Sequence, residues 1–433
     1  MVRRDAPSRS AHLSSLIYNY KSMQTNTNSA YSISSEGRGI GLPMFFCLYI
    51  AQSIPSSFFA TALQVMMREA NYSLATIGLL QLVKLPWVLK FLWSPMVDRH
   101  CISGRDFRRC IIISECIYAL FIVLAGQLNV ADNLYLIILL VCLSLAASAT
   151  QDIATDALAI LMHEGRDKSM VNSMQSMGSF GGALLGSGVL LLVLHKFGWH
   201  VVTPCLGVFV LLMLIPLTRQ KHLDKCIKDR KQRARLTDFA SFFAQRGIWR
   251  QVGFLLLYYA SIIGILSMMR PWLVDLGYSM KEIGVMSGIV GTSVAFCASF
   301  GAGFLVRRIG ISVARKLFAW FVFITTCYFF GISFIAHPST AVLYGGIALM
   351  WSSYGMATIV VYTSAMECVR PGREGTDFTV QTVITHLSGI IMAALSGSVA
   401  HQFGYQGLFA AELLIALVSL IYIYKIFQNK HAA

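Results

Sequence analysis

Two long apolar runs of this sequence each contain a pair of charged side chains, where a charge is costly. Lys84 and Lys90 share one run, and Asp152 and Asp156 share another. If these runs cross a bilayer, each charge near the centre costs at least ~2.5–3.5 kcal/mol, so each must face water, a solute or an opposite charge. Counted inward from the same membrane face, we expect Lys90 at the depth of Asp156 and Lys84 near that of Asp152. The lysines then either line a solute cavity or form static ion pairs that hold two segments together.

The two aspartates are four residues apart, so a helix presents them on one face, which Gln151 and Thr155 extend. Two neighbouring carboxylates cannot both ionise cheaply in a medium of low dielectric constant, so one of them holds a proton near neutral pH. That property suits proton coupling at Asp152 and Asp156. The alternative is that one acid pairs with a lysine and the other contacts backbone at a helix end or the turn at Asp98.

His386 also lies in the middle of an apolar run, and an imidazole titrates in the useful range when it is hydrated. It is either a third proton-coupling group or a packing residue. Arg270, which precedes Pro271, either attracts an anionic solute or extends to the membrane interface. Neutral hydrogen-bonding groups in the runs complete the expected solute cavity; they are Gln52, Gln81, Tyr354, Tyr362 and Gln381.

The elements that carry these residues are apolar helices. Of 433 residues 56% are hydrophobic and 13% charged, against ~25% charged in ordinary soluble domains. Runs of ~20 apolar residues are long enough to cross a bilayer. We predict twelve spans, at roughly 42–66, 75–97, 110–127, 134–162, 170–194, 200–217, 251–273, 281–305, 314–335, 340–366, 377–400 and 407–427. Glu115 and Glu412 are expected at span ends, interfacial or paired, and the glycines of the fifth span predict a close helix approach.

The net charge of +15 is a topology signal. With the first residues assigned to the cytoplasm, 29 of the 35 Lys and Arg lie on the cytoplasmic side, and three lie on the opposite side: Arg68, Lys196 and Lys281. This asymmetry predicts that both ends of the chain are cytoplasmic. Residues 1–40 are expected to be a disordered cytoplasmic tail, and residues 218–250 a basic cytoplasmic linker between six-helix bundles at 41–217 and 251–433.

The two predicted bundles are related by a repeat at an offset of 206 residues. The segment 71–78 (NYSLATIG) matches 277–284 (GYSMKEIG), and 195–200 (HKFGWH) matches 401–406 (HQFGYQ). Each half has an even number of spans, so the halves share one orientation in the membrane, which is the parallel-repeat arrangement of major facilitator transporters. The predicted fold class is an all-α integral membrane protein with twelve transmembrane helices in two pseudo-symmetric bundles.

Two motifs carry a narrower resemblance. The segment 84–99 (KLPWVLKFLWSPMVDR), together with 150–156 (TQDIATD), resembles the AmpG-like branch of the major facilitator superfamily. The resemblance implies proton-driven movement of a bulky solute across the bacterial inner membrane. The turn that follows resembles the cytoplasmic gating loop of that superfamily, which would be formed here by Asp98, Arg99, Gly104, Arg105, Arg108 and Arg109. A purely topogenic basic loop is the alternative.

We therefore expect a proton-driven importer of a bulky, anionic solute. A muropeptide-type peptidoglycan fragment comes first, a ferric siderophore or related metallophore second, and acetyl-coenzyme A third. An intramembrane acyl or lipid transferase with His386 as base is a different class, which the repeat disfavours. We expect no cofactor, no metal site and no disulfide, because the ten cysteines lack metal-ligand spacing. The expected partners are the solute, a proton and the lipid bilayer, without nucleic acid, and the protein is expected to be monomeric.

Overall fold

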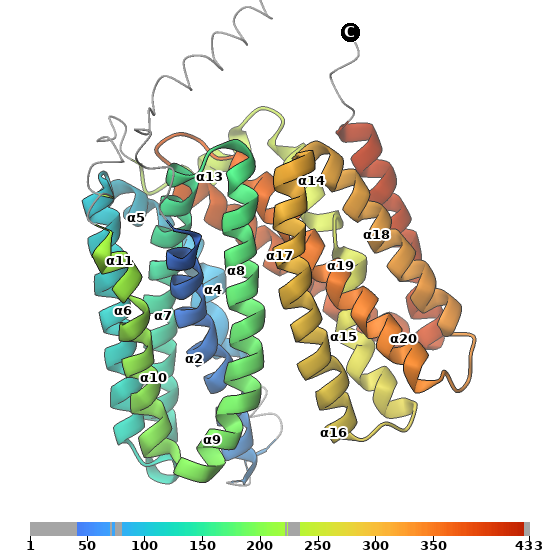
Figure 1. The fold of residues 1–433 in the computed structure, drawn as a ribbon, viewed down its shortest axis with the longest axis horizontal. Helices are drawn as coiled ribbons and strands as arrows, with labels where there is room; N and C mark the ends of the chain where they lie inside the picture. The colour runs from blue at the N-terminus through green and yellow to red at the C-terminus, as the bar shows by residue number, and fades with distance from the viewer. Residues whose placement is uncertain (1–40, 70–71, 74–79, 221–222, 224–233, 428–433) are drawn as a thin grey trace, which may run out of the picture.

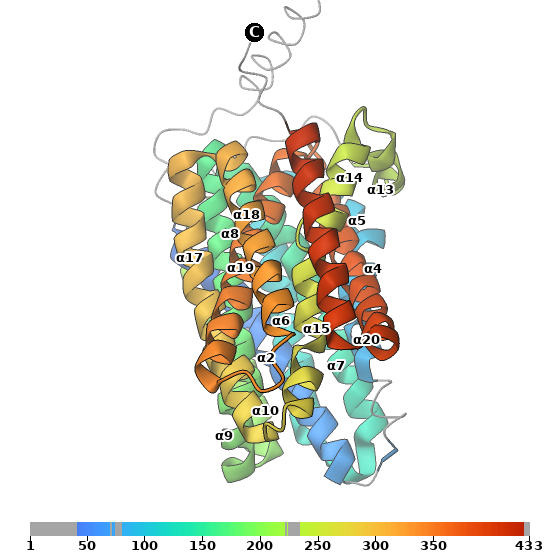
Figure 2. The same ribbon diagram turned by 90° about the vertical axis from the view of Figure 1, so that its right-hand side faces the viewer.

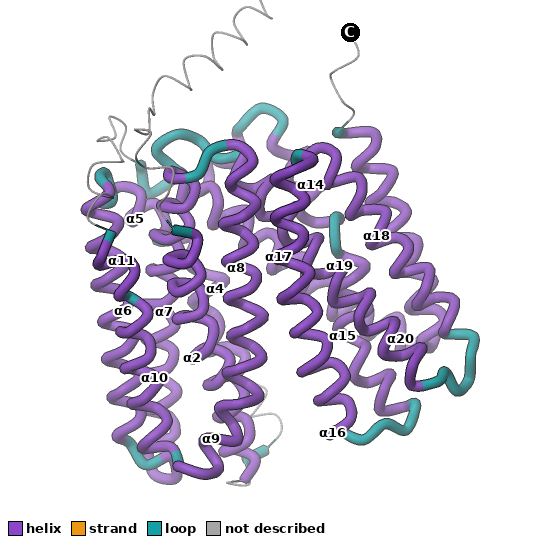
Figure 3. Tube along the Cα trace, viewed as in Figure 1, coloured by secondary structure: helices purple, strands orange, loops and turns teal. Residues whose placement is uncertain are grey.

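The computed structural model describes residues 41–69, 72–73, 80–220, 223 and 234–427. The expected tail at 1–40 and residues 221–222 and 224–233 of the expected linker lie outside these ranges. The described chain is helical, with helices joined by short turns and loops and no strand among the described residues (Figure 3).

Ten helices in the described ranges are long and apolar enough to cross a membrane. In the first half they are formed by α2 (Leu42–Glu69), α6 (Gly104–Gln127), α7 (Val130–Met162), the run η4 (Gly165–Asp167), α8 (Lys168–Leu184), η5 (Leu185–Val189) and α9 (Leu190–Phe197), and the pair α10 (Trp199–Met213) and α11 (Ile215–Arg219). In the second half they are formed by α14 (Ile248–Leu257) with α15 (Ala260–Asp275), α16 (Met280–Ile283) with η7 (Gly284–Gly291) and α17 (Thr292–Ile309), α18 (Ile311–Ile332), α19 (Thr340–Glu367) and α20 (Glu374–Ile426).

The remaining two predicted crossings are present in other forms. The second is broken into the short helices η2 (Leu80–Lys84), α4 (Leu85–Leu89), η3 (Lys90–Leu92) and α5 (Ser94–His100). Pro86 and Pro95 begin α4 and α5, where their missing N–H groups end the preceding hydrogen-bonded turn. The last two crossings are the two parts of α20, which Gly404 separates with a φ of 67°. Twelve crossings, as the sequence predicts, account for the helices of the described residues.

The helices form two bundles. The N-terminal bundle (α2 to α11) and the C-terminal bundle (α14 to α20) stand side by side, with the short helix α13 (Asp238–Ser241) at one end (Figure 1). Helices of the two bundles contact each other where α8 meets α17 and α19, and where α5 and α7 meet α20. We call the end that holds α5 and α13 the joined end. Towards α9 and α16 at the other end, the bundles diverge (Figure 1). In the view turned by 90°, α20 lies on the side of the molecule that faces the viewer (Figure 2).

Small residues bring α8 and η5 against α2, as the glycine pattern of the fifth span predicts. A Cβ added at Gly178 would lie 2.7 Å from the Cβ of Tyr49, and one added at Gly182 would overlap Ser53. Gly186 meets the backbone of α2 in the same way, whereas Gly188 faces open space. Three glycines of this run therefore allow two helices to approach closely, and this contact fixes Tyr49 beside α8.

Candidate transport site

A buried ion pair lies in the N-terminal bundle. The Lys90 Nζ lies 2.5 Å from Asp152 Oδ2, and the side chains are 2% and 3% exposed. The expectation that Lys90 lies level with Asp156 is wrong. The second crossing continues to His100 instead of ending near Val97, so Lys90 is ten residues from its end, as Asp152 is from Met162 at the end of α7.

Asp152 and Asp156 of α7 are both bound by residues of α2. Gln52 Nε2 donates to Asp152 Oδ1 at 2.9 Å, and the Tyr49 hydroxyl donates to Asp156 Oδ1 at 2.7 Å. Gln175 of α8 donates to the same Asp156 oxygen at 3.2 Å. The sequence analysis did not select Tyr49 or Gln175 for the site. Tyr49 lies one helical turn before Gln52, and this spacing is the signal that would have placed both residues on the face of α2 towards α7.

The C-terminal bundle contributes to the same region. His386 of α20 is exposed, and it interacts electrostatically with Lys90 and Asp152 across the contact between α20 and α7. Tyr362 of α19 is half-buried and interacts with both aspartates. The structure therefore gathers the three expected proton-coupling groups, one lysine and one tyrosine from both bundles. The protonation of a group that interacts with both bundles depends on how the bundles are arranged.

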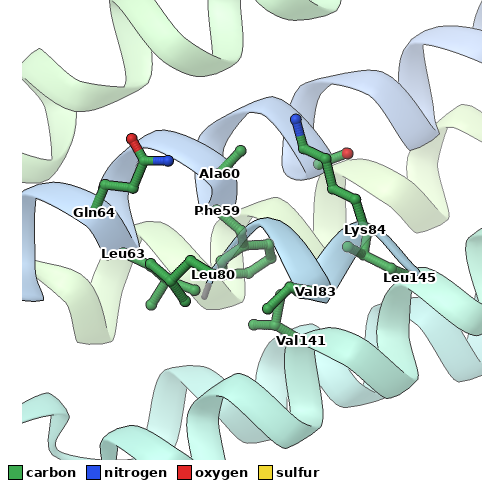
Figure 4. A pocket seen from close by; sticks show the side chains of 10 residues that line it. Phe59, Ala60, Leu63, Gln64, Leu80, Val83, Lys84, Val141 and Leu145 are labelled. Carbon is green, nitrogen blue, oxygen red and sulfur yellow. The ribbon is translucent and has the colours of Figure 1, made fainter. Parts of the chain in front are cut away.

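Lys84 stands apart from this cluster. It is exposed and lines a small pocket between α2, η2 and α7, in which it faces Gln64 from the other end (Figure 4). The pocket holds about 20 Å³, room for one or two waters. Asp152, which we expected near the depth of Lys84, is bound by Lys90 instead. Of the two lysines in this crossing, Lys84 is thus the one whose charge is accessible.

The remaining expected cavity residues are dispersed. Arg270 is exposed near the end of α15. Tyr354 joins an aromatic cluster that crosses between the bundles, 5.7 Å from the ring of Phe180 and 6.1 Å from that of Trp351. Gln381 is fully buried and bonds Gln251 and the Ala365 carbonyl, so its amide connects three helices of one bundle instead of facing a cavity. The side chain of Gln81 lies outside the described residues.

At the joined end, Asp98 of the expected gating loop reaches the other bundle. Its carboxylate accepts from the backbone N–H of Gly375 at 3.1 Å and of Thr376 at 2.6 Å, and from the Thr376 hydroxyl at 2.7 Å. An anion bound to the first N–H groups of a helix is favoured by the helix dipole. Asp98 therefore caps α20 across the bundle interface.

The other members of the expected loop lie nearby. Gly104 is buried at the start of α6, where Ser103 and Asp106 form a capping box, whereas Arg99, Arg105 and Arg109 are exposed and Arg108 is half-buried. Four contacts close the joined end further. Arg307 pairs with Asp167 at 2.8 Å, and hydrogen bonds run from Ser169 to the Gly303 carbonyl, from Ser173 to the Ser299 carbonyl and from Lys168 to the Met366 carbonyl.

The segment between the bundles also binds at the joined end. Arg373 pairs with Asp238 of α13 at 2.7 Å, and Arg370 donates to the Asp238 carbonyl and to Ser241. Burial acts to raise the pKa of Asp238, but bonds from the Arg235 N–H and the Arg373 guanidinium outweigh it and hold that pKa below its usual value. The ring of Phe239 meets Phe91 of the N-terminal bundle at 5.7 Å. Thus α13 touches both bundles beside the Asp98 cap.

The amino-acid sequence is similar to those of known membrane transporters. The model of the Major Facilitator Superfamily matches residues 43–393. The chain belongs to this superfamily. It is 22% identical over 86% of its length to the anhydromuropeptide permease of Escherichia coli K12, covering 77% of that protein, and 23% identical over 84% of its length to a putative transporter, AmpG 3, of Rickettsia prowazekii, covering 90% of it. The predicted family resemblance is confirmed.

Solved structures agree in fold. A bacterial homologue of the iron transporter ferroportin, in an outward-facing state, superposes with a TM-score of 0.67 at 17% identity, over 90% of this chain and 98% of the other. The proton:xylose symporter XylE superposes with a TM-score of 0.62 at 11% identity, over 90% and 94% of the two chains. The chain is therefore a multi-pass membrane protein with the fold of this transporter superfamily.

Proposed function

We propose that this protein is a proton-driven importer of an anionic, sugar-containing solute, most specifically a muropeptide-type fragment. The observation that carries the proposal is the Lys90–Asp152 pair, which lies at the bundle interface with Asp156, Tyr362 and His386 around it. Secondary transporters of this fold alternate by rocking one bundle against the other around such a site. The similarity to an anhydromuropeptide permease supports the choice of solute.

The ion pair suggests how proton and solute binding are linked. While Asp152 is charged it holds Lys90, whose charge is then neutralised and 2% exposed. A proton on Asp152 removes this attraction and leaves Lys90 as a cation that lacks a counter-ion, which a carboxylate of the solute can supply. Proton and anionic solute thus bind cooperatively, and by linkage each raises the affinity for the other. This cooperativity is what symport requires.

Orientation and domain boundaries form part of the same proposal. The joined end carries exposed arginines in the last turn of α5, the first two turns of α6 and the last turn of α17, such as Arg99, Arg109 and Arg307. Under the positive-inside rule that end is cytoplasmic, as are both ends of the chain. The present arrangement, joined there and divergent at the other end, would then be an outward-facing state of bundles 41–217 and 251–433, connected by the linker at 218–250. The membrane would be the bacterial inner membrane.

The test is uptake of a radiolabelled anhydromuropeptide into proteoliposomes, with and without an inward proton gradient. Uptake should be concentrative with the gradient and collapse with a protonophore. Asp152→Asn and Asp156→Asn should lose concentrative uptake and retain gradient-independent exchange, whereas Asp132→Asn, an exposed aspartate at the start of α7, should behave as the wild type. Accumulation by both site variants would contradict coupling at these carboxylates. A ferric siderophore and acetyl-coenzyme A, tested as probes in the same vesicles, decide between the three solute classes.

A further inference from the structure

A further carboxyl group is buried in the N-terminal bundle, away from the ion pair. Glu115 of α6 is 1% exposed, and neither of its carboxyl oxygens has a hydrogen-bond partner among the described residues. It lies eleven residues from Gly104, the first residue of α6, which is about 16 Å along a helix. The expectation that Glu115 lies at a span end is therefore wrong, because α6 extends on both sides of it.

Glu115 differs from the other buried acids in its surroundings. Asp152 is bound by Lys90 and Gln52, and Asp156 by Tyr49 and Gln175. Asp152 has donors on both oxygens and Asp156 has two donors on one oxygen, whereas both oxygens of Glu115 lack a donor among the described residues. An ionised carboxylate without a cation or donor is too costly to bury at such a position. Glu115 therefore holds a proton in this state.

The structure connects Glu115 to the proposed site through two residues. Tyr118, one turn along α6, interacts electrostatically with Glu115, and its hydroxyl donates to the backbone carbonyl of Gln52 at 3.3 Å. The side chain of Gln52 in turn donates to Asp152. Ser148 of α7 is also fully buried, and its hydroxyl interacts with that of Tyr118. A shift of α2 or α7 thus changes the surroundings of Asp152 and of Glu115 together.

The neighbouring elements carry other titratable groups. On α7 the buried ones are Asp152 and Asp156, besides Cys142 and the exposed Asp132 and Tyr135; on α2 the buried one is Tyr49, besides Cys47 and the exposed Arg68 and Glu69. On α10 they are His200, whose ring bonds the Gly126 carbonyl, and the exposed Cys205. On α6 itself they are Tyr118, the exposed Cys116 and, in the first two turns, Arg105, Asp106, Arg108, Arg109 and Cys110. The cations on these elements lie in the last turn of α2 and the first two turns of α6, and Lys90 of η3 is bound to Asp152.

We propose that Glu115 is a second proton-binding group of the transporter, which retains its proton in the state described here and releases it in another state of the cycle. The inference rests on the proposed proton coupling. A carboxyl that stayed neutral in every state would serve no better than leucine at this buried position, and polar groups retained inside a membrane protein are costly. Release becomes favourable when movement of α2 and α7 brings water or a donor to Glu115.

The direct test is infrared spectroscopy of the purified protein, in which the carbonyl band of a protonated carboxylic acid is separated from that of a carboxylate. At neutral pH the wild type should show such a band that is missing in Glu115→Gln, and Tyr118→Phe should change its frequency. Glu282→Gln is the control and should leave the band unchanged, because Glu282 is exposed and its carboxylate accepts from the backbone N–H of Ser279 at 2.8 Å. Identical wild-type and Glu115→Gln spectra would overturn the inference.

Two further measurements keep folding and function apart. Glu115→Gln replaces a neutral acid by a neutral amide of the same size, so its melting temperature should stay close to that of the wild type, while Asp152→Asn should melt lower. In proteoliposomes, Glu115→Gln should lower the number of protons taken up per anhydromuropeptide at least twofold. An unchanged ratio would contradict the role of Glu115 while leaving the proposed function intact. Wild-type uptake that does not depend on the proton gradient would instead contradict the proposed function. In that case the infrared band would still decide whether Glu115 is protonated.

Discussion

Asp98 and Thr376 lie 278 residues apart in the sequence and are joined by two hydrogen bonds. The backbone N–H of Thr376 lies 2.6 Å from Asp98 Oδ2, and the Thr376 hydroxyl lies 2.7 Å from the same oxygen. The bonds link the end of the second crossing to the start of α20. Any movement that opens the joined end must break them, so the stability of this closed end depends on the charge of Asp98.

Asp98→Asn should shift the protein towards opening at the joined end. Hydrogen bonds to a charged group contribute ~1.5–3 kcal/mol, and loss of about half of that changes the equilibrium roughly tenfold. The measurement is the rate of alkylation of a cysteine introduced at Met366, which is fully buried at this end, in a cysteine-depleted background. Asp132→Asn serves as the control. Equal alkylation rates in both variants would contradict a gating role of the cap.

Lys90→Ala should destabilise the protein strongly, because it leaves Asp152 as an uncompensated buried charge. Removal of one partner of a buried pair costs ~3–5 kcal/mol. The double variant Lys90→Ala with Asp152→Asn should recover part of that loss, since no charge remains unpaired. Thermal melting in detergent measures both variants. A double variant that melts as low as Lys90→Ala would show that the pair does not account for the loss.

Lys84→Ala should abolish or severely reduce uptake at near-normal abundance in the membrane. The side chain is exposed, so its removal creates no buried unpaired charge, whereas an accessible cation within a crossing is suited to attract an anionic solute. The measurement is initial uptake of anhydromuropeptide against protein amount. Lys196→Ala changes an exposed lysine at the end of α9 and should leave uptake unchanged. Normal uptake kinetics in Lys84→Ala would reject a role in solute binding.

Topology is tested by reporter fusions. A reporter inserted after His337, in the loop between α18 and α19, should report the periplasm, and one inserted after Arg230 should report the cytoplasm. The reason is the distribution of 29 Lys and Arg on one side against three on the other. The reverse pattern of activity would overturn the orientation and the assignment of the present state as outward-facing.

The contact of α13 with α20 should be independent of pH in the physiological range. Because its pKa is held below the usual value, Asp238 stabilises the contact above the ordinary carboxyl pKa, and the effect is lost only as the pH falls below about 4. In hydrogen exchange, Asp238→Asn should open α13 about fivefold more, for a loss of ~1 kcal/mol. After correction for intrinsic exchange, wild-type protection should be equal at pH 5 and pH 8. A loss of protection at pH 5 would contradict this assignment.

The sequence by itself determined the architecture. Hydrophobic length, the repeat at an offset of 206 and the two motifs were enough to predict twelve crossings in two bundles and the superfamily, because membrane insertion is governed by local apolar length and needs no knowledge of side-chain contacts. The same reasoning selected Lys90, Asp152 and His386, since a charge in an apolar run is visible without coordinates.

Only the tertiary structure decided which groups meet. The partner of Lys90 changed from Asp156 to Asp152 because helix boundaries shift depth by about 1.5 Å per residue, and two prolines broke the second crossing into short helices. Gln381 proved to be an internal connection, and Glu115 a buried acid without a partner among the described residues, although both look alike in sequence as polar residues among apolar ones. Whether a polar side chain faces a cavity or a neighbouring helix depends on helix rotation and packing, which residues distant in the sequence determine together.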